Sequence, residues 1–233
     1  MIPARYAASR FPGKLMQKLG DKTVIRRVYE ASFQTGLFDD VIVVTDSDVI
    51  EEEIKNINGH VVRSKKEHES CSDRIAEAAA TIEVDIILNV QGDTRFIKKE
   101  PLEKLLKLFD DKTVQVASLM QIISDGKVIA DPNRVKVCVD KKNNSLLFSR
   151  SIIPYPRNEN ASPVYYEHIG VYAFRKQALL DFTSWPVSPL EDAEKIECLR
   201  YLENGIPLRM GLTDYIGVSI DTPEYLEKAK TLV

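Results

Sequence analysis

The first half of the chain alternates short apolar runs with helical patterns, and this alternation constrains the fold more than any other feature. Val41–Val44 is an unbroken apolar run, and Ile86–Val90 is an apolar run with Asn89 as its one polar residue. Runs of this length and composition are typical of strands buried on both faces. Apolar residues at helical spacing follow Thr23, a plausible N-cap, and the pattern ends at Gly36. Such strand–helix alternation predicts a parallel sheet with right-handed crossovers.

The pattern changes after the first half of the chain, where strand-like runs follow one another with short links. These runs are Val116–Ile122, Val135–Val139, Leu146–Ser149 and Tyr165–Phe174, and they predict an antiparallel insertion. A helix is then expected over 190–203, strands over 208–212 and 216–220, and a last helix from Pro223. The predicted class is α/β, a Rossmann-like, mostly parallel sheet flanked by helices with a small antiparallel insertion, in one domain spanning residues 1–233.

Composition and charge exclude several classes of protein. A net charge of −3 argues against general nucleic-acid binding, which usually needs a basic face. The three cysteines are widely spaced without a C-x-x-C pair, so neither a zinc site nor a disulfide framework is indicated, and a reducing cytoplasm is expected. We find no signal peptide and no apolar run near ~20 residues, and therefore expect no membrane insertion.

Three cations lie close together near the start of the chain, at Arg5, Arg10 and Lys14, and small residues and Pro12-Gly13 stand between them. Only Met1 and Ile2 precede Pro3, so the first strand is expected to be short. Arginine forks onto phosphate oxygens and lysine supplies a compact charge, while Gly13 can adopt backbone angles closed to other residues. The stretch predicts a polyphosphate site, with a solvated basic loop as the alternative.

Polar residues end two of the predicted strands. Gln91 and Asp93 follow Ile86–Val90, and Asp221 follows the strand over 216–220. Ligands of open α/β sheets bind beyond the carboxyl ends of strands, and Mg²⁺ takes one or two carboxylates together with phosphate oxygens. Asp93 and Asp221 are therefore candidate Mg²⁺ ligands, and Gln91 is a candidate for a base edge or a sugar hydroxyl. The alternatives are helix N-caps for the two aspartates and a bond to a neighbouring loop for Gln91.

The motifs and their order along the whole chain resemble the 3-deoxy-manno-octulosonate cytidylyltransferase (CMP-KDO synthetase) family. The matching segments are IPARYAASRFPGK at 2–14, SDRIAE at 72–77, NVQGD at 89–93, FSR at 148–150, HIGVY at 168–172, SPLE at 188–191 and DTPE at 221–224. The resemblance implies a nucleotide-diphospho-sugar transferase fold. It also implies a Mg²⁺-dependent transfer from CTP to the acid sugar KDO, for lipopolysaccharide synthesis, by a homodimer whose interface the insertion around 116–174 would form.

The resemblance also implies roles for individual residues. Ser72 and Arg74, at the start of a helix that Ser72 or Asp73 is expected to cap, would contact the cytosine and ribose. Lys14, Arg10 and Asp93 would be catalytic. The two cations would steady the phosphates and the leaving pyrophosphate, and Asp93 would hold the Mg²⁺ that polarises the α-phosphate. Four residues would line the acid-sugar pocket, with Arg150 suited to a carboxylate and His168 and Glu197 to hydroxyls; the set is Arg150, His168, Tyr172 and Glu197. On a regular strand, His168 and Tyr172 share a face.

Three positions depart from the pattern of the family. Cys71 stands where the family usually has glycine, and a positive φ there would be strained. Thr94-Arg95 replaces Glu-Pro after the metal aspartate, and Cys198 replaces glutamine after Glu197. These changes leave open another acid sugar, such as 8-amino-KDO or a sialic acid, or a weakly active or non-catalytic nucleotide binder.

A glycosyltransferase is an alternative of a different class, because such enzymes usually carry Asp-x-Asp after a strand. Asp46-Ser47-Asp48 fits that pattern, although it is also expected to begin a helix, which favours a structural role.

Overall fold

The computed structural model describes residues 1–6, 11–66, 68, 70–95, 98–158, 160–214 and 218–219, with the backbone alone at 94–95 and 218–219. The chain forms two compact units, Met1–Glu100 with Gly217–Val233 and Pro101–Ile216. Among the described helices, none is long and apolar enough to cross a membrane.

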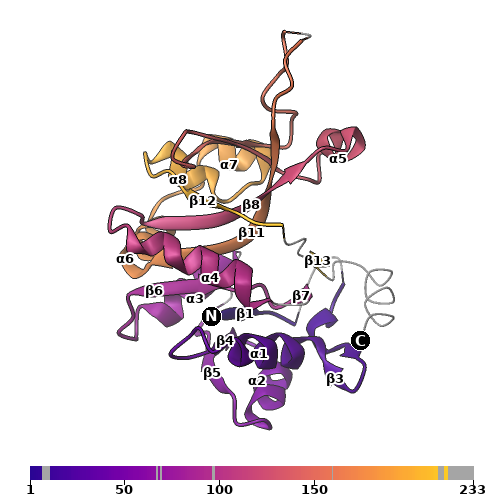
Figure 1. Cartoon of the computed structure of the whole chain (residues 1–233). Coiled ribbons are helices and arrows are strands. Elements are labelled where there is room, and N and C mark those ends of the chain that lie inside the picture. Colours follow the sequence, from indigo (N-terminus) through magenta and orange to yellow (C-terminus); the bar gives the residue numbers. More distant parts are fainter. Residues whose placement is uncertain are drawn as a thin grey trace. The chain divides into compact units, whose positions relative to one another are not determined.

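The first unit is built on a parallel sheet with the strand order β1-β4-β5 (Figure 1). β1 spans Ile2–Ala4, β4 Ile42–Thr45 and β5 His60–Arg63. Two backbone hydrogen bonds fix Met1 beside β6 (Ile86–Asn89): the amino group of Met1 donates to Leu88 O at 2.7 Å, and Val90 N donates to Met1 O at 3.0 Å. The predicted parallel arrangement is confirmed, and β1 is short as expected.

The remaining described elements of this unit are η1 (Lys14–Met16), β2 (Lys18–Leu19), β3 (Lys22–Thr23), α1 (Val24–Gln34), α2 (Asp48–Lys55), α3 (Cys71–Ala79), β7 (Thr94–Arg95) and β13 (Val218–Ser219). Thr23 caps α1 as predicted, because its Oγ1 accepts from Arg26 N at 3.3 Å. The predicted cap of α3 is wrong. Ser70 is the N-cap and accepts from Asp73 N at 3.0 Å, so Ser72 lies within the first turn and is buried.

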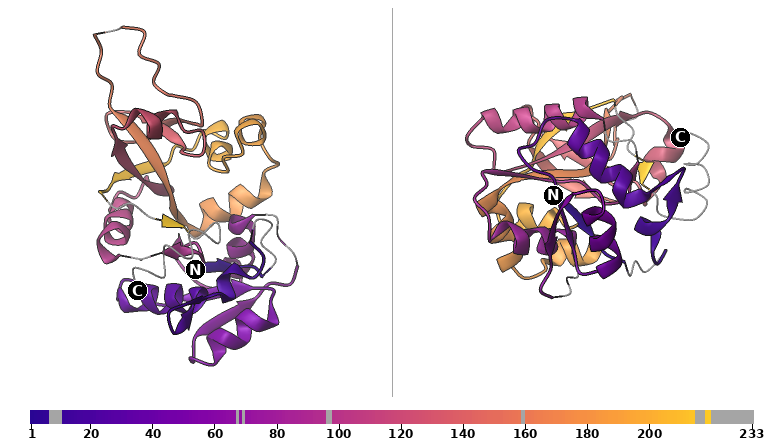
Figure 2. Two further views of the ribbon diagram at one scale, coloured as in Figure 1. Left: turned by 90° about the vertical axis from the view of Figure 1, so that its right-hand side faces the viewer. Right: turned by 90° about the horizontal axis from the view of Figure 1, so that it is seen from below.

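The second unit contains a mixed sheet with the order β10-β9-β11-β8-β12 (Figure 1). Its strands are β8 (Val116–Ile123), β9 (Lys136–Val139), β10 (Ser145–Ser149), β11 (Tyr165–Arg175) and β12 (Arg209–Leu212). β11 is antiparallel to both β8 and β9, and β10 is antiparallel to β9, which confirms the predicted antiparallel strands. β12 pairs with β8 in parallel, so the sheet is mixed. The described residues between β10 and β11 extend away from this sheet (Figures 1 and 2).

The other described elements are α4 (Lys99–Lys107), η2 (Leu108–Asp110), α5 (Gly126–Ala130), α6 (Lys176–Ser184), α7 (Pro189–Glu194) and α8 (Leu199–Glu203). The single helix predicted over 190–203 is wrong. The chain breaks at Lys195, whose φ is 53°. The carbonyls of Glu194 and Lys195 accept hydrogen bonds from the Arg150 side chain. The break leaves Glu197 in the turn that joins α7 to α8.

Candidate functional site

The structure brings together the candidate phosphate and metal residues of the first unit, Lys14 and Asp93. Gly13 precedes η1 with a φ of 68°, and its N–H donates to Tyr6 O at 2.8 Å, which closes the N-terminal loop. The Lys14 ammonium then forms an ion pair with the Asp93 carboxylate; their side chains are 17% and 15% exposed. A cation and a carboxylate from distant parts of the sequence thus meet at one accessible point.

Gly92 explains how Asp93 reaches this position. A Cβ at residue 92 would lie 3.0 Å from Pro3 O and 3.3 Å from Leu15 Cδ1, so a larger residue would force these neighbours to shift, whereas glycine lets the turn after β6 pack closely against β1. The carboxyl ends of parallel strands meet at one edge of a sheet. Asp93 therefore lies at the edge where sequence reasoning expected a ligand.

Cys71 contacts Gln91, the other candidate at the end of β6. The Cys71 thiol donates to Gln91 Oε1 with an S···O distance of 3.5 Å, and this contact orients the amide. Cys71 is the first residue of α3, and among the described residues the non-glycine positions with positive φ are Asn58, Asn143 and Lys195. The expected strain at Cys71 therefore does not arise.

Arg74 is buried rather than displayed at the surface, with 4% of the residue exposed. Its guanidinium donates to Asp46 Oδ2 at 2.8 Å and to Ser64 Oγ at 3.1 Å. These bonds join α3 to the ends of β4 and β5. Arg5 is exposed. Arg10, Asp221, the final helix from Pro223 and the side chains of Thr94 and Arg95 lie outside the described residues.

In the second unit, a bulge brings His168 and Tyr172 together. Four residues of a regular strand span about 13 Å, yet the two ring centroids are 5.3 Å apart. The register with β8 shifts between Ile169 and Tyr172, so that His168 faces Met120 while Tyr172 faces Ser118. The two side chains share a face as predicted, although the extra residues of the bulge account for their contact.

Burial keeps both side chains neutral near pH 7. The His168 ring lies edge-on to Phe148, with centroids 4.9 Å apart, and burial lowers the pKa of His168 to about 4. Burial also raises the pKa of Tyr172 well above its usual value, and Cys198 and Glu197 add to that shift. A hydrogen bond joins the Tyr172 hydroxyl to the thiol of Cys198, which is 2% exposed. Cys198 therefore helps to fix the position of the Tyr172 ring, and the charge of Glu197 is close enough to raise the pKa of the Tyr172 hydroxyl.

Arg150 is fixed by hydrogen bonds to Glu194, the last residue of α7. Its Nε donates to Glu194 O at 2.6 Å, and its backbone N–H donates to the Glu194 carboxylate at 2.8 Å. A third bond joins a terminal nitrogen to Pro132 O at 2.9 Å. Sequence reasoning missed Glu194, since a glutamate in a predicted helix gives no signal of a partner far away in the sequence.

Lys136 is a second residue that sequence reasoning missed. It is 0% exposed, although the alternating pattern of β9 places its side chain on the other face of the strand from the apolar Val137. Its ammonium donates to the carbonyls of Asp131, Arg134 and Arg150 at 2.9, 2.6 and 2.7 Å, and burial lowers its pKa. Lys136 thus fixes the backbone at Arg150 by contacts that no sequence pattern reports.

The Ser188–Glu191 motif is structural. Glu191 caps α7 by accepting from Ser188 N at 3.3 Å, and both its oxygens accept from Arg200 at 2.6 Å. The Arg200 guanidinium also lies 4.1 Å from the centroid of the Phe182 ring. Trp185 packs edge-on against Tyr201, with centroids 5.9 Å apart. This contact gives Trp185 a packing role.

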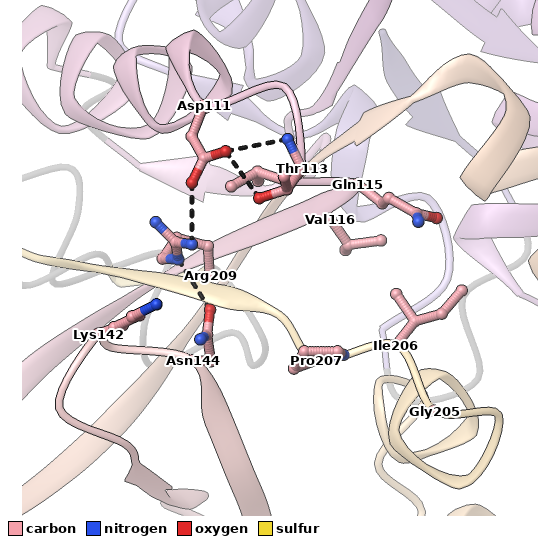
Figure 3. Close-up of a pocket in the computed structure, with 11 residues that line it drawn as sticks. Asp111, Thr113, Gln115, Val116, Lys142, Asn144, Gly205, Ile206, Pro207 and Arg209 are labelled. Atoms are coloured by element: carbon pink, nitrogen blue, oxygen red, sulfur yellow. Dashed lines mark hydrogen bonds and ion pairs between the residues drawn. The ribbon is translucent and has the colours of Figure 1, made fainter.

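A separate cavity of about 530 Å³ opens in the second unit, and its lining contains none of the predicted site residues (Figure 3). Arg209 donates to Asn144 Oδ1 at 2.8 Å and to Asp111 Oδ2 at 3.2 Å, while Asp111 accepts from Thr113. These polar groups satisfy one another, so the cavity gives no evidence of a ligand.

Comparison with known proteins identifies the family. The family described as Cytidylyltransferase matches residues 1–229. The 3-deoxy-manno-octulosonate cytidylyltransferase of Flavobacterium johnsoniae is 56% identical over 236 residues, covering 100% of this chain and 97% of the relative. The chain belongs to the 3-deoxy-manno-octulosonate cytidylyltransferase family. The enzyme of Bacteroides thetaiotaomicron is 42% identical over 240 residues, covering 99% of this chain and 95% of the relative.

A solved CMP:2-keto-3-deoxy-manno-octonic acid synthetase complexed with CTP has the same fold. It superposes with a TM-score of 0.94 at 38% identity, covering 99% of this chain and 95% of that chain. Membership of the 3-deoxy-manno-octulosonate cytidylyltransferase family, a nucleotidyltransferase family, confirms the predicted fold class. The glycosyltransferase alternative loses its support, because Asp46 and Asp48 form ion pairs with Arg74 and Arg63.

Proposed function

We propose that this protein transfers a cytidylyl group from CTP to KDO and releases pyrophosphate, for lipopolysaccharide synthesis. The anomeric hydroxyl of KDO attacks the α-phosphate in line, an oxygen–phosphorus bond forms, and the bond to the β-phosphate bridge oxygen breaks. The ion pair of Lys14 with Asp93 is the observation that carries the proposal, together with the full-length similarity to family members. Phosphoryl transfer depends mainly on positioning and charge neutralisation; Lys14 would supply positive charge, and Asp93 would hold a divalent cation.

The first unit would bind CTP. Lys14, Arg5 and Arg10 would neutralise the β- and γ-phosphates, and the exposed side chain of Arg5 is free to reach solvent. Gln91 and Ser72 would contact the nucleoside near the Cys71 thiol. Arg74 would support this contact indirectly, by holding α3 in place, since its guanidinium is bound to Asp46 and Ser64.

The second unit would bind the acid sugar. Arg150 would face its carboxylate, and His168, Tyr172 and Glu197 would contact hydroxyls. The aromatic rings at 168 and 172 form an apolar wall with polar edges, which suits the face of a sugar ring. Burial keeps His168 and Tyr172 neutral, so Arg150 is the group of this set that would supply positive charge.

A divalent cation fits the donor set of the first unit. Mg²⁺ needs one or two carboxylates and otherwise takes phosphate oxygens and water, and Asp93 presents a partly exposed carboxylate at the end of β6. Asp93 and Asp221 would hold it. When bound, Mg²⁺ would withdraw charge from the α-phosphate and lower the pKa of the attacking hydroxyl.

Pyrophosphate release with CTP and Mg²⁺ tests the proposal. Release is expected with KDO, and not with 8-amino-KDO or a sialic acid. Release with another sugar alone would identify a different substrate, and CTP binding without release with any sugar would indicate a non-catalytic nucleotide binder. UTP in place of CTP controls for the base.

We also propose a homodimer formed by the insertion around 116–174. Large apolar side chains are exposed there, with Ile122 at 58%, Leu146 at 62% and Tyr155 at 82%. Light scattering should report twice the 26.4 kDa chain mass, and Ile122→Asp with Leu146→Asp should give a monomer. Phe33→Asp, at an exposed site of the first unit (67%), should leave the dimer intact.

The free thiols of Cys71, Cys138 and Cys198 are consistent with a reducing compartment, and we propose the cytoplasm.

A further inference from the structure

Ser118 lies on β8 beneath the bulge of β11, with 0% of the residue exposed. Three polar atoms surround its hydroxyl. Oγ lies 2.8 Å from Val171 O, 3.0 Å from Ile169 O and 3.0 Å from His168 Nε2. None of the roles assigned above uses this serine.

The hydroxyl has a single proton, and this fixes the direction of each hydrogen bond. The carbonyls of Ile169 and Val171 only accept, so the Ser118 proton points toward them. If it pointed toward His168 instead, the two carbonyl oxygens would face the lone pairs of Oγ at 2.8 and 3.0 Å, which is repulsive. Nε2 of His168 must therefore carry a proton and donate it to Ser118.

A neutral imidazole carries one ring proton, so the proton on Nε2 leaves Nδ1 as an acceptor. Burial lowers the pKa of His168 to about 4, which keeps the ring neutral near pH 7. No residue in the described part of the chain donates a hydrogen bond to Nδ1. A lone pair cannot bind a carboxylate, which is itself only an acceptor, but it can bind a hydroxyl.

The same hydroxyl also holds the bulge in place. Ile169 and Val171 flank Gly170, and the bulge moves Tyr172 to within 5.3 Å of His168 between ring centroids. Ser118 thus acts on both the position and the tautomer of the histidine.

We infer that Ser118 is a positioning residue for the acid sugar, which fixes His168 in the Nε2–H tautomer so that Nδ1 accepts a hydrogen bond from a sugar hydroxyl. The inference rests on the proposed function, because that function places His168 in the sugar pocket. It specifies which kind of substrate group His168 recognises, a hydroxyl rather than the carboxylate.

The tautomer can be measured without turnover. The chain has three histidines, so two-bond ¹H–¹⁵N spectra at pH 7.5, assigned with His168→Gln, should resolve His168. We expect an unprotonated Nδ1 and a protonated Nε2 in the unliganded protein. A protonated Nδ1 would overturn the inference whatever the activity. In Ser118→Ala the two tautomers should mix.

Kinetics provide the second test. Ser118→Ala should raise the KM for KDO about tenfold, as expected for one lost buried hydrogen bond, while the KM for CTP stays within about twofold. Ser118→Thr keeps the hydroxyl and should restore most of the affinity. Ser145→Ala is the matched control, since Ser145 is also buried and its Oγ accepts from Leu208 N at 2.8 Å.

The two failures are distinguishable. No turnover of CTP with KDO by the wild-type protein would refute the proposed function and leave the tautomer result standing. Normal wild-type turnover with an unchanged KM for KDO in a folded Ser118→Ala variant would refute the role of Ser118 alone.

Discussion

Lys14 of the first unit begins the short helix η1 and Asp93 follows strand β6, whereas His168 and Tyr172 of the second unit lie within one strand. The first pair depends on backbone conformation at Gly13 and on close packing at Gly92. The second pair depends on a bulge that a buried hydroxyl on the neighbouring strand holds. Under the proposed function, the first pair would offer charged groups to a triphosphate, and the second pair would offer neutral groups that discriminate a sugar by shape and hydrogen bonding.

The comparison predicts that first-unit variants lose turnover, whereas second-unit variants lose sugar affinity. Asp93→Ala and Lys14→Ala should each lower kcat about 1,000-fold, the scale of one lost electrostatic contact in a transition state. Steady-state pyrophosphate release measures the loss, and circular dichroism checks the fold. Lys22→Ala removes a comparable lysine that pairs with Glu30 at 2.6 Å, and should leave kcat near the wild-type value. A kcat near normal in Lys14→Ala would break the comparison.

Arg150→Ala should act on binding rather than on the chemical step. We expect the KM for KDO to rise about 30-fold, because a charge-assisted bond contributes about 2 kcal/mol. Arg209→Ala is the control in the same unit, since its guanidinium pairs with Asp111 at 3.2 Å beside the separate cavity. A fall in kcat with an unchanged KM for KDO would contradict this assignment.

The pH dependence of stability should also differ between the units. The unfolded chain takes up a proton on histidine near pH 6.5, whereas folded His168 does so only near pH 4. The contribution of His168 to stability is therefore complete above about pH 6.5 and is lost progressively as the pH falls from there to about 4, a total loss of about 3 kcal/mol. Urea unfolding between pH 7 and 4.5 should show a shallower loss in His168→Gln than in the wild type.

His60→Gln is the matched control for the pH experiment. His60 is exposed in the first unit, where it pairs with Asp40 at 2.6 Å. This variant should retain the wild-type loss of stability between pH 7 and 4.5. If the free energy of unfolding falls equally with pH in the wild type and in His168→Gln, burial of His168 does not cause the loss of stability in acid.

The smallest effect is expected at Cys71. A thiol is a weak donor, so Cys71→Ala should change the KM for CTP by less than about threefold, in keeping with a contact worth well under 1 kcal/mol. Gln91→Ala removes the amide itself and should have the larger effect. A tenfold rise in Cys71→Ala would show that the orientation of Gln91 is set mainly by the thiol.

Much of the fold follows from patterns that act over short distances. The apolar run at β4, the cap at Thr23 and the glycine before η1 depend on neighbouring residues, so they can be predicted from the order of side chains alone. The cations of the N-terminal loop and Asp93 after β6 were predicted for the same reason, because strand ends fix which edge of the sheet a residue reaches.

Only the tertiary structure decided where buried polar groups found their partners. Lys136 binds three carbonyls, Arg74 binds Asp46, and the break at Lys195 accompanies bonds from Arg150. Each depends on atoms that folding brings from elsewhere in the sequence, which no local period reports. The sequence by itself determined the α/β class and the loops that carry charge. Long-range hydrogen bonds decided the bulge at Gly170 and thereby how His168 and Tyr172 meet, because a buried donor or acceptor must be satisfied by whatever group packs against it.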